Sequence, residues 1–321
     1  MRQRKLGATD TEVSAVGLGC MGMSWGYAES TRDDTVSISV LRGALDRGVS
    51  FVDTSDVYGD GHNEVLVGEG IRGRRSEVVL ATKCGLVVDD LASRVMHRDG
   101  SPRHLRTAIE ASLRRLRVDA VDLYYLHRVD PQVPLEDSWG ALAEFVAEGK
   151  VARLGLSEVT PEQASLAHRI HPVTAVQSEL SLWTRDALAP GADMVAWCAD
   201  NGAAFVPYSP LGRGFLTGTV SGPADFEESD FRASSPRFAA GAIEPNLRIV
   251  EVARRIANRR HVTPAQVAIA WTLGQGEHVV PIPGTKKESY LAENIAAADI
   301  VLTEQDMDEL DRAPAAVGAR Y

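Results

Sequence analysis

The stretch VSFVDTSDVYGDGHNEVLVGEGIRGRRSEVVLATK, residues 49–83, contains the pattern that decides the fold. It begins with the apolar run VSFVDTS (49–55) and ends with the apolar run VVLATK (78–83). Continuous apolar runs of this length, rich in Val, Ile and Leu, are typical of strands buried on both faces of a parallel sheet. Each run also carries a charged residue near its carboxyl end, Asp53 in the first and Lys83 in the second.

Six more runs of this kind bring the number of predicted strands to eight. They are AVGLG (15–19), VDLYYLH (121–127), ARLGLS (152–157), TAVQSE (174–179), AFVPYS (204–209) and VVPIPG (279–284). Helix-like segments separate them, with expected caps at Thr31, Ser101, Thr160 and Thr263, the last three followed by Pro. Eight strands alternating with helices favour an α/β fold of the (β/α)8 barrel type over an open doubly wound sheet. We expect one barrel domain over residues 1–321, preceded at its start by a short hairpin.

Two connections, 85–101 and 211–245, are too long for ordinary turns between a strand and a helix. Residues 211–245 could form an interdomain linker. Because periodic structure resumes afterwards without a change of composition, we favour a lid over a substrate or cofactor instead.

Composition limits the classes of partner. The 321 residues include 44 acidic and 34 basic ones, which gives a net charge of −10 and argues against nucleic acid or an anionic membrane as the main partner. No apolar run is long enough for a membrane helix, and the charged first residues do not resemble a signal peptide. The three cysteines (Cys20, Cys84, Cys198) are far apart, which indicates neither a disulfide framework nor a structural zinc site. A reducing cytoplasm is the expected location, and the oligomeric state is left open.

Chemically suggestive residues fall at or near the carboxyl ends of the predicted strands. They are Asp53, Lys83, His127, Ser157, Gln177, Tyr208, Ser209 and Gly284. In a barrel these ends meet on one face, where barrel enzymes hold their active sites. Taken alone, Asp53 could cap a turn, and His127 could be a histidine of the core. Lys83 is harder to dismiss, because a buried lysine needs an acidic partner, and Asp53 on the neighbouring strand is the natural one.

The segment FVDTSDVYGDGHNEVLVGEGI (51–71) resembles the signature of the aldo-keto reductase family. Further motifs of that family follow in order, from about residue 4 to residue 312. They are VVLATK, DLYYLH, GLSE, QSELSLW, PYSPLGRGFLTG and PIPGTKKESYLAEN. The resemblance implies an NADP(H)-dependent oxidoreductase that reduces aldehydes or ketones to alcohols on a barrel without a Rossmann domain. It also implies a catalytic tetrad of Asp53, Tyr58, Lys83 and His127.

The chemistry of the four residues agrees with these implied roles. Carbonyl reduction needs a proton donor near the oxygen, and Tyr58 can serve as that general acid. The ordinary pKa of tyrosine, about 10, is high for this task, so we expect the Lys83 ammonium to lower it. Asp53 would keep Lys83 charged and in place, while His127 would orient the carbonyl group.

The resemblance also implies residues that hold the cofactor. Ser157 and Gln177 resemble the contacts to the nicotinamide carboxamide, and Tyr208 resembles the aromatic residue that stacks on the ring. Glu158 stands where many relatives have Asn, and it can accept a hydrogen bond but not donate one. The residues that resemble the loop around the pyrophosphate are Ser209, Leu211, Gly212 and Gly214.

A pair of lysines predicts a preference for NADPH over NADH. Lys286 and Lys287 directly precede a predicted helix, where positive charge is unfavourable unless an anion binds there. Thr285, after the strand end at Gly284, would add a donor to a 2′-phosphate site, and Tyr290 stands where many relatives have Arg. By resemblance, Glu293 and Asn294 would lie near the adenine.

Three residues are assigned to the substrate pocket: Trp25, Tyr27 and Leu180, the last at a position where related sequences often have Tyr. The motif GxGxxG at residues 17–22 is judged a chance match, because no helix pattern follows it. The alternative functions are a weakly catalytic nucleotide sensor, as in the potassium-channel β subunits of this superfamily, and a metal-dependent hydrolase. No cluster with metal-ligand spacing supports the second, so no metal site is expected. The physiological substrate is not predicted.

Overall fold

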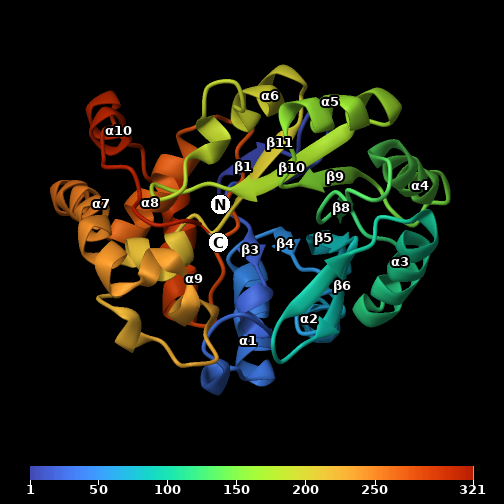
Figure 1. The fold of residues 1–321 in the computed structure, drawn as a ribbon, viewed down its shortest axis with the longest axis horizontal. Coiled ribbons are helices and arrows are strands. Elements are labelled where there is room, and N and C mark those ends of the chain that lie inside the picture. The colour runs from blue at the N-terminus through green and yellow to red at the C-terminus, as the bar shows by residue number, and fades with distance from the viewer. Residues whose placement is uncertain (321) are drawn as a thin grey trace.

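Parallel strands form a curved central sheet in the computed structural model, which describes residues 1–320. Seven strands are hydrogen-bonded in the order β11-β10-β9-β8-β5-β4-β3. Their bounds are β3 Leu18–Gly19, β4 Phe51–Asp53, β5 Val79–Cys84, β8 Leu123–Leu126, β9 Leu154–Ser157, β10 Val173–Glu179 and β11 Ala204–Tyr208. Figure 1 shows these strands around the centre of the molecule, with the helices outside them. The predicted α/β barrel is therefore confirmed, and seven of the eight predicted strands are found at their expected places.

The eighth predicted strand, residues 279–284, closes the barrel without forming a regular ladder. Val280 and Ile282 donate backbone hydrogen bonds to Phe205 and Pro207 of β11. The carbonyl groups of Pro281 and Pro283 accept from Gly17 and Gly19 on the other side. Since proline has no N–H group, Pro281 and Pro283 cannot donate hydrogen bonds of their own. The segment nevertheless joins β11 to β3.

Glycine is required where the barrel closes. A Cβ atom on Gly284 would lie 2.9 Å from the carbonyl oxygen of Gly19, and a Cβ on Gly19 would lie 2.7 Å from that of Ile282. Contacts this short are forbidden for real side chains, so both positions must lack one. Gly284 is also exposed at the barrel mouth.

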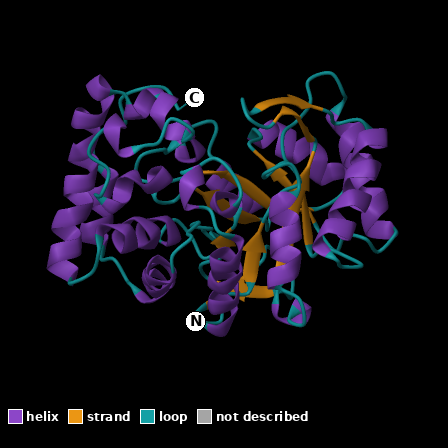
Figure 2. Cartoon of the chain, turned by 90° about the horizontal axis from the view of Figure 1, so that it is seen from below, coloured by secondary structure: helices purple, strands orange, loops and turns teal. Residues whose placement is uncertain are grey.

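Within the described residues, ten α-helices surround the barrel or follow its last strand, and Figure 2 shows helices on the outside of the strands. Their bounds are α1 Asp34–Asp46, α2 His62–Gly70, α3 Pro102–Leu116, α4 Leu135–Ala147, α5 Pro161–Ile170, α6 Met194–Asp200, α7 Ala240–Arg260, α8 Pro264–Leu273, α9 Glu288–Ala296 and α10 Glu304–Asp311. The caps predicted at Ser101, Thr160 and Thr263 are confirmed. The cap predicted at Thr31 is wrong: Thr31 ends a short 3-10 turn, and Asp33 caps α1 by accepting a hydrogen bond from the Val36 amide.

The predicted opening hairpin consists of β1 (Gln3–Lys5) and β2 (Glu12–Ser14). It covers the end of the barrel where the strands begin. Arg4 donates to the carbonyl groups of Leu273 and Gly276, which precede the eighth strand, and the Ala8 amide donates to Gly202, which precedes β11. The opposite end, where the strands finish, is therefore left for the site.

Both long connections lie over that opposite end. Residues 85–101 contain an antiparallel hairpin of β6 (Leu86–Asp90) and β7 (Val95–Arg98). Residues 211–245 form several 3-10 turns, and α7 begins within this range. The second connection contacts the loop after β3, because Asp230 accepts from the Ala28 amide at 3.0 Å and the Phe231 amide donates to Gly26 at 3.1 Å. The segment thus packs across its own barrel, as expected of a lid and not of an interdomain linker.

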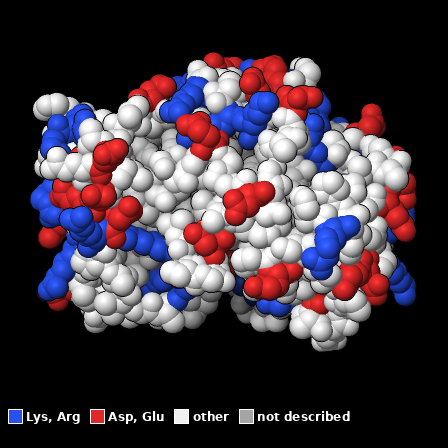
Figure 3. Space-filling view, turned by 90° about the horizontal axis from the view of Figure 1, so that it is seen from above, with Lys and Arg blue, Asp and Glu red and all other residues white. Residues whose placement is uncertain are grey.

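The surface carries charges of both signs. On the face shown in Figure 3, acidic and basic side chains are interspersed. Many charged side chains of the protein are paired, as in the contacts of Arg106 with Glu144 and Glu148. Within residues 1–320, no helix has both the length and the apolar character needed to cross a membrane. Cys20, Cys84 and Cys198 are all buried as free thiols.

Candidate active site

Lys83 and Asp53 form a buried ion pair at the mouth of the barrel. The register of β4 and β5 places the two residues on neighbouring strands, and Lys83 Nζ lies 2.5 Å from Asp53 Oδ1. Lys83 Nζ also donates to the Thr54 carbonyl at 2.7 Å and contacts the Tyr58 hydroxyl at 3.2 Å. An ammonium group has three protons, and three acceptors surround this one. Lys83 is fully buried, so these contacts replace the water that it loses.

Tyr58 lies on the loop between β4 and α2, with its hydroxyl directed at Lys83. Burial raises the pKa of Tyr58 above its ordinary value, and the nearby Lys83 ammonium opposes that rise. The prediction that the pKa of Tyr58 is lowered is therefore wrong for the protein without bound ligands, although the charge of Lys83 acts in the predicted direction. Burial also opposes the charge of Lys83, but Asp53 and Tyr58 more than compensate, and the pKa of Lys83 is raised. Lys83 therefore stays positively charged beside the phenol.

His127 follows β8, and its ring lies beside the ring of Tyr58. The Tyr58 and His127 rings are 6.0 Å apart between centroids and nearly perpendicular. Burial, with Arg128 and Lys83 nearby, holds the pKa of His127 well below its ordinary value, so the imidazole is neutral. Its Nδ1 atom lies 3.2 Å from Ser55 Oγ, which lies 3.0 Å from Asp56 Oδ1. Ser55 and Asp56 therefore decide which ring nitrogen carries the proton.

Ser157 is the last residue of β9, and Gln177 lies inside β10, next to the ion pair. Gln177 donates from Nε2 to Asp53 Oδ2 at 2.7 Å, which leaves its Oε1 atom as an acceptor. Ser157 Oγ accepts from Arg128 Nη1 at 3.0 Å, so its own proton remains to be donated elsewhere. The two side chains thus present one donor and one acceptor.

Glu158 adopts a left-handed backbone conformation with φ of 54°, which a non-glycine residue rarely does. Its Oε1 atom accepts from the Glu179 amide at 2.9 Å, and its Oε2 atom lies 2.6 Å from Arg320 Nη2. The same Arg320 nitrogen donates to the Tyr208 hydroxyl at 2.8 Å. Glu158 is therefore an ion-paired carboxylate and not an isolated one.

The residues assigned to the pyrophosphate follow β11 directly. Ser209, Gly212 and Gly214 have left-handed φ values of 52°, 55° and 93°. The Leu211 carbonyl accepts from the amides of Gly214 and Leu216, which holds the turn closed. Successive left-handed residues turn the backbone sharply, and such turns can direct amide groups at an anion.

The residues assigned to the 2′-phosphate and the adenine surround the start of α9. Lys286 Nζ donates to Thr31 Oγ1 at 2.6 Å and to the Ala28 carbonyl at 3.2 Å, so it is held against the loop after β3. Burial and the cation Arg32 lower the pKa of Lys286. Lys287 is exposed, with its ammonium 5.0 Å from the centre of the Tyr290 ring.

The other residues assigned to the 2′-phosphate and the adenine already make contacts within the protein or are buried. Thr285 Oγ1 accepts from the Lys287 amide at 3.1 Å, Glu293 accepts from the Thr263 hydroxyl, and Asn294 is buried. α9 itself has no side-chain cap at its start.

The three residues assigned to the substrate pocket have different surroundings. Trp25 lies beside Tyr58, with 6.1 Å between ring centroids, and its indole N–H is buried without a hydrogen-bond partner among the described residues. Tyr27 packs on Phe231 of the second long connection. Leu180 is fully buried in the core, so any effect that it has on a substrate must be indirect.

Comparisons with known proteins identify the family of this chain. The model of the aldo/keto reductase family matches residues 15–314. The chain belongs to that family. A probable aldo-keto reductase from Glycine max is 44% identical over 307 residues, which cover 95% of this chain and 87% of that protein. Aldo/keto reductases are oxidoreductases that act on small carbonyl compounds.

Solved structures of other aldo/keto reductases have the same fold. A glycerol dehydrogenase from Gluconobacter oxydans superposes with a TM-score of 0.86 at 29% identity, covering 96% of this chain and 94% of its own. An aldo/keto reductase from Klebsiella pneumoniae, solved in complex with NADP and acetate, gives a TM-score of 0.73 at 25% identity, covering 97% and 95%.

Four polar residues of this aldo/keto reductase site were missed from the sequence: Ser55, Asp56, Arg128 and Arg320. Ser55 and Asp56 lie inside the quoted signature, and Arg128 follows His127, so their positions offered a signal. Arg320 offered none, because its partner Glu179 is 141 residues away along the chain. No group of three His, Cys, Asp or Glu side chains suited to a metal ion occurs in the part of the chain that is described.

Proposed function

We propose that this aldo/keto reductase reduces aldehydes or ketones to alcohols with NADPH, and that Tyr58 is the general acid. The observation that carries the proposal is the contact of 3.2 Å between the Tyr58 hydroxyl and Lys83 Nζ, beside a neutral His127. When bound, NADPH supplies the hydride. The protein must then hold the carbonyl oxygen and deliver a proton to it.

Tyr58 delivers that proton from its hydroxyl oxygen. As negative charge develops on the carbonyl oxygen, Tyr58 gives up its proton, and the Lys83 ammonium stabilises the phenolate left behind. Asp53 holds Lys83 at 2.5 Å, so this cation needs no rearrangement during the reaction. His127, protonated on Nε2, donates a second hydrogen bond to the same oxygen.

The residues at the mouth have the chemistry that a nicotinamide cofactor requires. Ser157 offers a donor for the carboxamide oxygen, while Gln177 Oε1 offers an acceptor for the carboxamide nitrogen. Tyr208 would stack on the ring, and the exposed Gly284 leaves room for the backbone to approach a ligand closely. The lysines at the start of α9 would hold the 2′-phosphate.

The proposed reaction is tested with a panel of aldehydes and ketones, by following the loss of NADPH absorbance. We expect turnover with several members of the panel. Tight NADPH binding without turnover of any carbonyl compound would favour the nucleotide sensor instead.

A first prediction concerns pH. Burial and the charge of Glu64 raise the pKa of Asp56 to about 8, although some of Asp56 remains accessible to solvent. Below this pH, protonated Asp56 donates to Ser55, Ser55 donates to His127 Nδ1, and the ring proton sits on Nε2, facing the substrate. Above this pH, the Asp56 carboxylate accepts a hydrogen bond from Ser55. The hydrogen bonds then run in the opposite direction, and Ser55 accepts from His127 Nδ1. We expect kcat/KM for carbonyl reduction to fall as the pH rises through about 8.

The control for this prediction is Asp56→Asn, whose amide can donate to Ser55 at any pH. We expect the variant to lose the fall near pH 8 and to keep only one at higher pH, where Tyr58 ionises. An unchanged pH profile in Asp56→Asn would remove Asp56 from the account.

A second prediction concerns the choice of cofactor. Wild type should prefer NADPH, and Lys286→Ala/Lys287→Ala should lower the ratio of kcat/KM for NADPH over NADH by about tenfold or more, since hydrogen bonds to charged groups are lost. The kcat/KM for NADH should change little. Lys5→Ala, in the hairpin at the other end of the barrel, is the matched control. Preference for NADH in wild type, or the same ratio in the double variant, would contradict this assignment.

A further inference from the structure

The segment that follows α10 returns to the mouth of the barrel along a defined path. Val317 makes two hydrogen bonds with the buried Asn246 of α7: its amide donates to Oδ1 at 2.8 Å, and its carbonyl accepts from Nδ2 at 3.0 Å. Arg237 donates to the Gly318 carbonyl at 3.3 Å. Residues 312–320 are therefore docked on the barrel.

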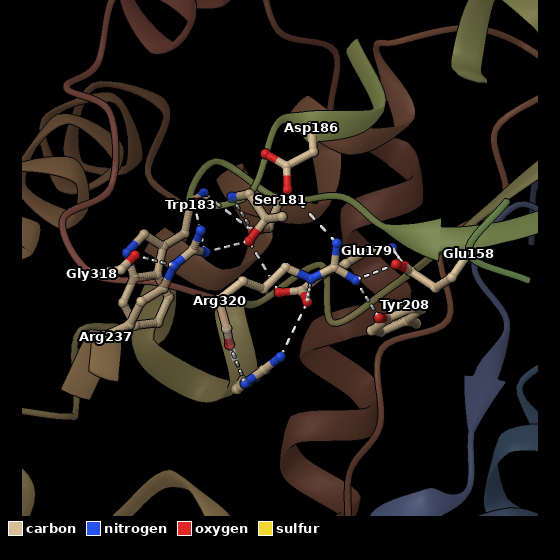
Figure 4. Close-up of polar contacts among 11 residues, drawn as sticks. Glu158, Glu179, Ser181, Trp183, Asp186, Tyr208, Arg237, Gly318 and Arg320 are labelled. Carbon is tan, nitrogen blue, oxygen red and sulfur yellow. Dashed lines mark hydrogen bonds and ion pairs between the residues drawn. The ribbon is translucent and has the colours of Figure 1, made fainter. Parts of the chain in front are cut away.

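This path delivers Arg320 to the ends of β9, β10 and β11. Its Nη2 atom lies 2.6 Å from Glu158 and 2.8 Å from the Tyr208 hydroxyl, and its Nε atom lies 2.8 Å from Glu179. Figure 4 shows the guanidinium group between these side chains. The Arg320 side chain is only 17% exposed, which is low for an arginine. One side chain thus connects the ends of three neighbouring strands.

The charges explain why a cation is needed there. Glu179 is 3% exposed, and Glu158 lies beside it with its own carboxylate. Burial opposes the charge of Glu158, but Arg320, the Glu179 amide and Arg128 together outweigh burial, so the pKa of Glu158 is lowered and it stays ionised. Arg213, at 3.2 Å, is a second cation on Glu179. Without Arg320, Glu158 would have to turn away from Glu179 or take up a proton.

We propose that Arg320 is a positioning residue for the nicotinamide end of the cofactor. It holds Glu158 as an ionised acceptor for the carboxamide nitrogen, and it fixes Tyr208 at the angle needed to cover the ring. Glu158 and Arg320 together fill the role that the resemblance gives to a single Asn. This inference rests on the proposed function, because only that function brings a nicotinamide to Ser157 and Tyr208.

The test separates the two ends of the cofactor by measuring equilibrium binding of two ligands. NADP⁺ has the nicotinamide, whereas adenosine 2′,5′-bisphosphate lacks it and keeps the 2′-phosphate. In Arg320→Met we expect the Kd for NADP⁺ to rise about tenfold or more, as for other lost hydrogen bonds to charged groups. The Kd for the bisphosphate should stay within about twofold, as for a surface substitution.

Three further variants sharpen the comparison. Arg312→Met removes the same charge from the same segment at a site that is 82% exposed, and should change neither Kd. Arg320→Lys should recover part of the NADP⁺ affinity, because a lysine restores the charge but not the fork that reaches Glu158 and Glu179 together. In the Glu158→Gln background, a further Arg320→Met change should raise the Kd for NADP⁺ by less than it does in wild type, since the Glu158 carboxylate is gone and only the hold on Tyr208 is lost.

The outcomes separate this inference from the proposed function. An equal loss of affinity for both ligands in Arg320→Met would overturn the inference and leave Arg320 as a support of the whole site. Tighter NADP⁺ binding would overturn it as well, because Arg320 would then occupy the nicotinamide position. If wild type binds neither NADP⁺ nor NADPH, the proposed function fails and the inference fails with it.

Discussion

Tyr58→Phe is expected to lose carbonyl reduction by about 100-fold or more, which is the usual size of a general-acid contribution. The substitution removes one oxygen atom and leaves the ring beside Trp25 and His127. Lys83 keeps its contacts with Asp53 and the Thr54 carbonyl, so the ion pair does not depend on the lost hydroxyl. The measurement is kcat for a good carbonyl substrate at saturating NADPH.

The control for Tyr58→Phe is cofactor binding. NADPH should bind the variant with nearly the same Kd as wild type, because none of the proposed cofactor contacts includes the Tyr58 hydroxyl. Near-normal turnover in the variant would show that another group supplies the proton, and the roles proposed for Lys83 and His127 would lose their basis.

Lys83→Met should reduce the rate strongly and raise the apparent pKa of the acidic group. Lys83 opposes the effect of burial on the pKa of Tyr58, so removing its charge leaves a weaker acid and an unstabilised phenolate. The substitution also leaves the Asp53 carboxylate buried without its cation. Breaking a buried ion pair costs about 3–5 kcal/mol of folding stability, so thermal unfolding must be followed as well.

Asp53→Asn/Lys83→Met separates the two effects. This double variant removes both charges, and it should recover much of the stability lost in Lys83→Met without recovering activity. A pH–rate profile that is the same in wild type and Lys83→Met would exclude Lys83 from the mechanism.

The barrel could be predicted because its strands are marked twice in the sequence, by apolar runs and by polar residues at their ends. Even the run 279–284 was visible, although its two prolines prevent a regular ladder in the structure. The end of the second long connection was not visible, since α7 begins at Ala240 and contains Pro245, a residue that usually argues against a helix.

The site residues that lie at strand ends were predicted, because the order of the strands brings those ends together. Asp53 and Lys83 lie on adjacent strands, so their pairing follows from strand order. The net direction of the Tyr58 pKa depends on how deeply the phenol is buried, which no spacing reveals. Leu180 was assigned to the pocket by position alone, whereas its side chain lies inside the core. Arg320 reaches the site through the docking of the segment before it, in which Val317 binds Asn246 and Gly318 binds Arg237.

The central claim is tested most directly by isotope transfer in the wild-type protein. NADPH carrying deuterium at both hydrogen positions of the reactive nicotinamide carbon is supplied with an aldehyde substrate, and the product is examined by mass spectrometry and NMR. The account predicts an alcohol with one deuterium on the former carbonyl carbon and a hydroxyl proton taken from solvent. An alcohol without deuterium, or no alcohol although the cofactor is bound, would contradict it.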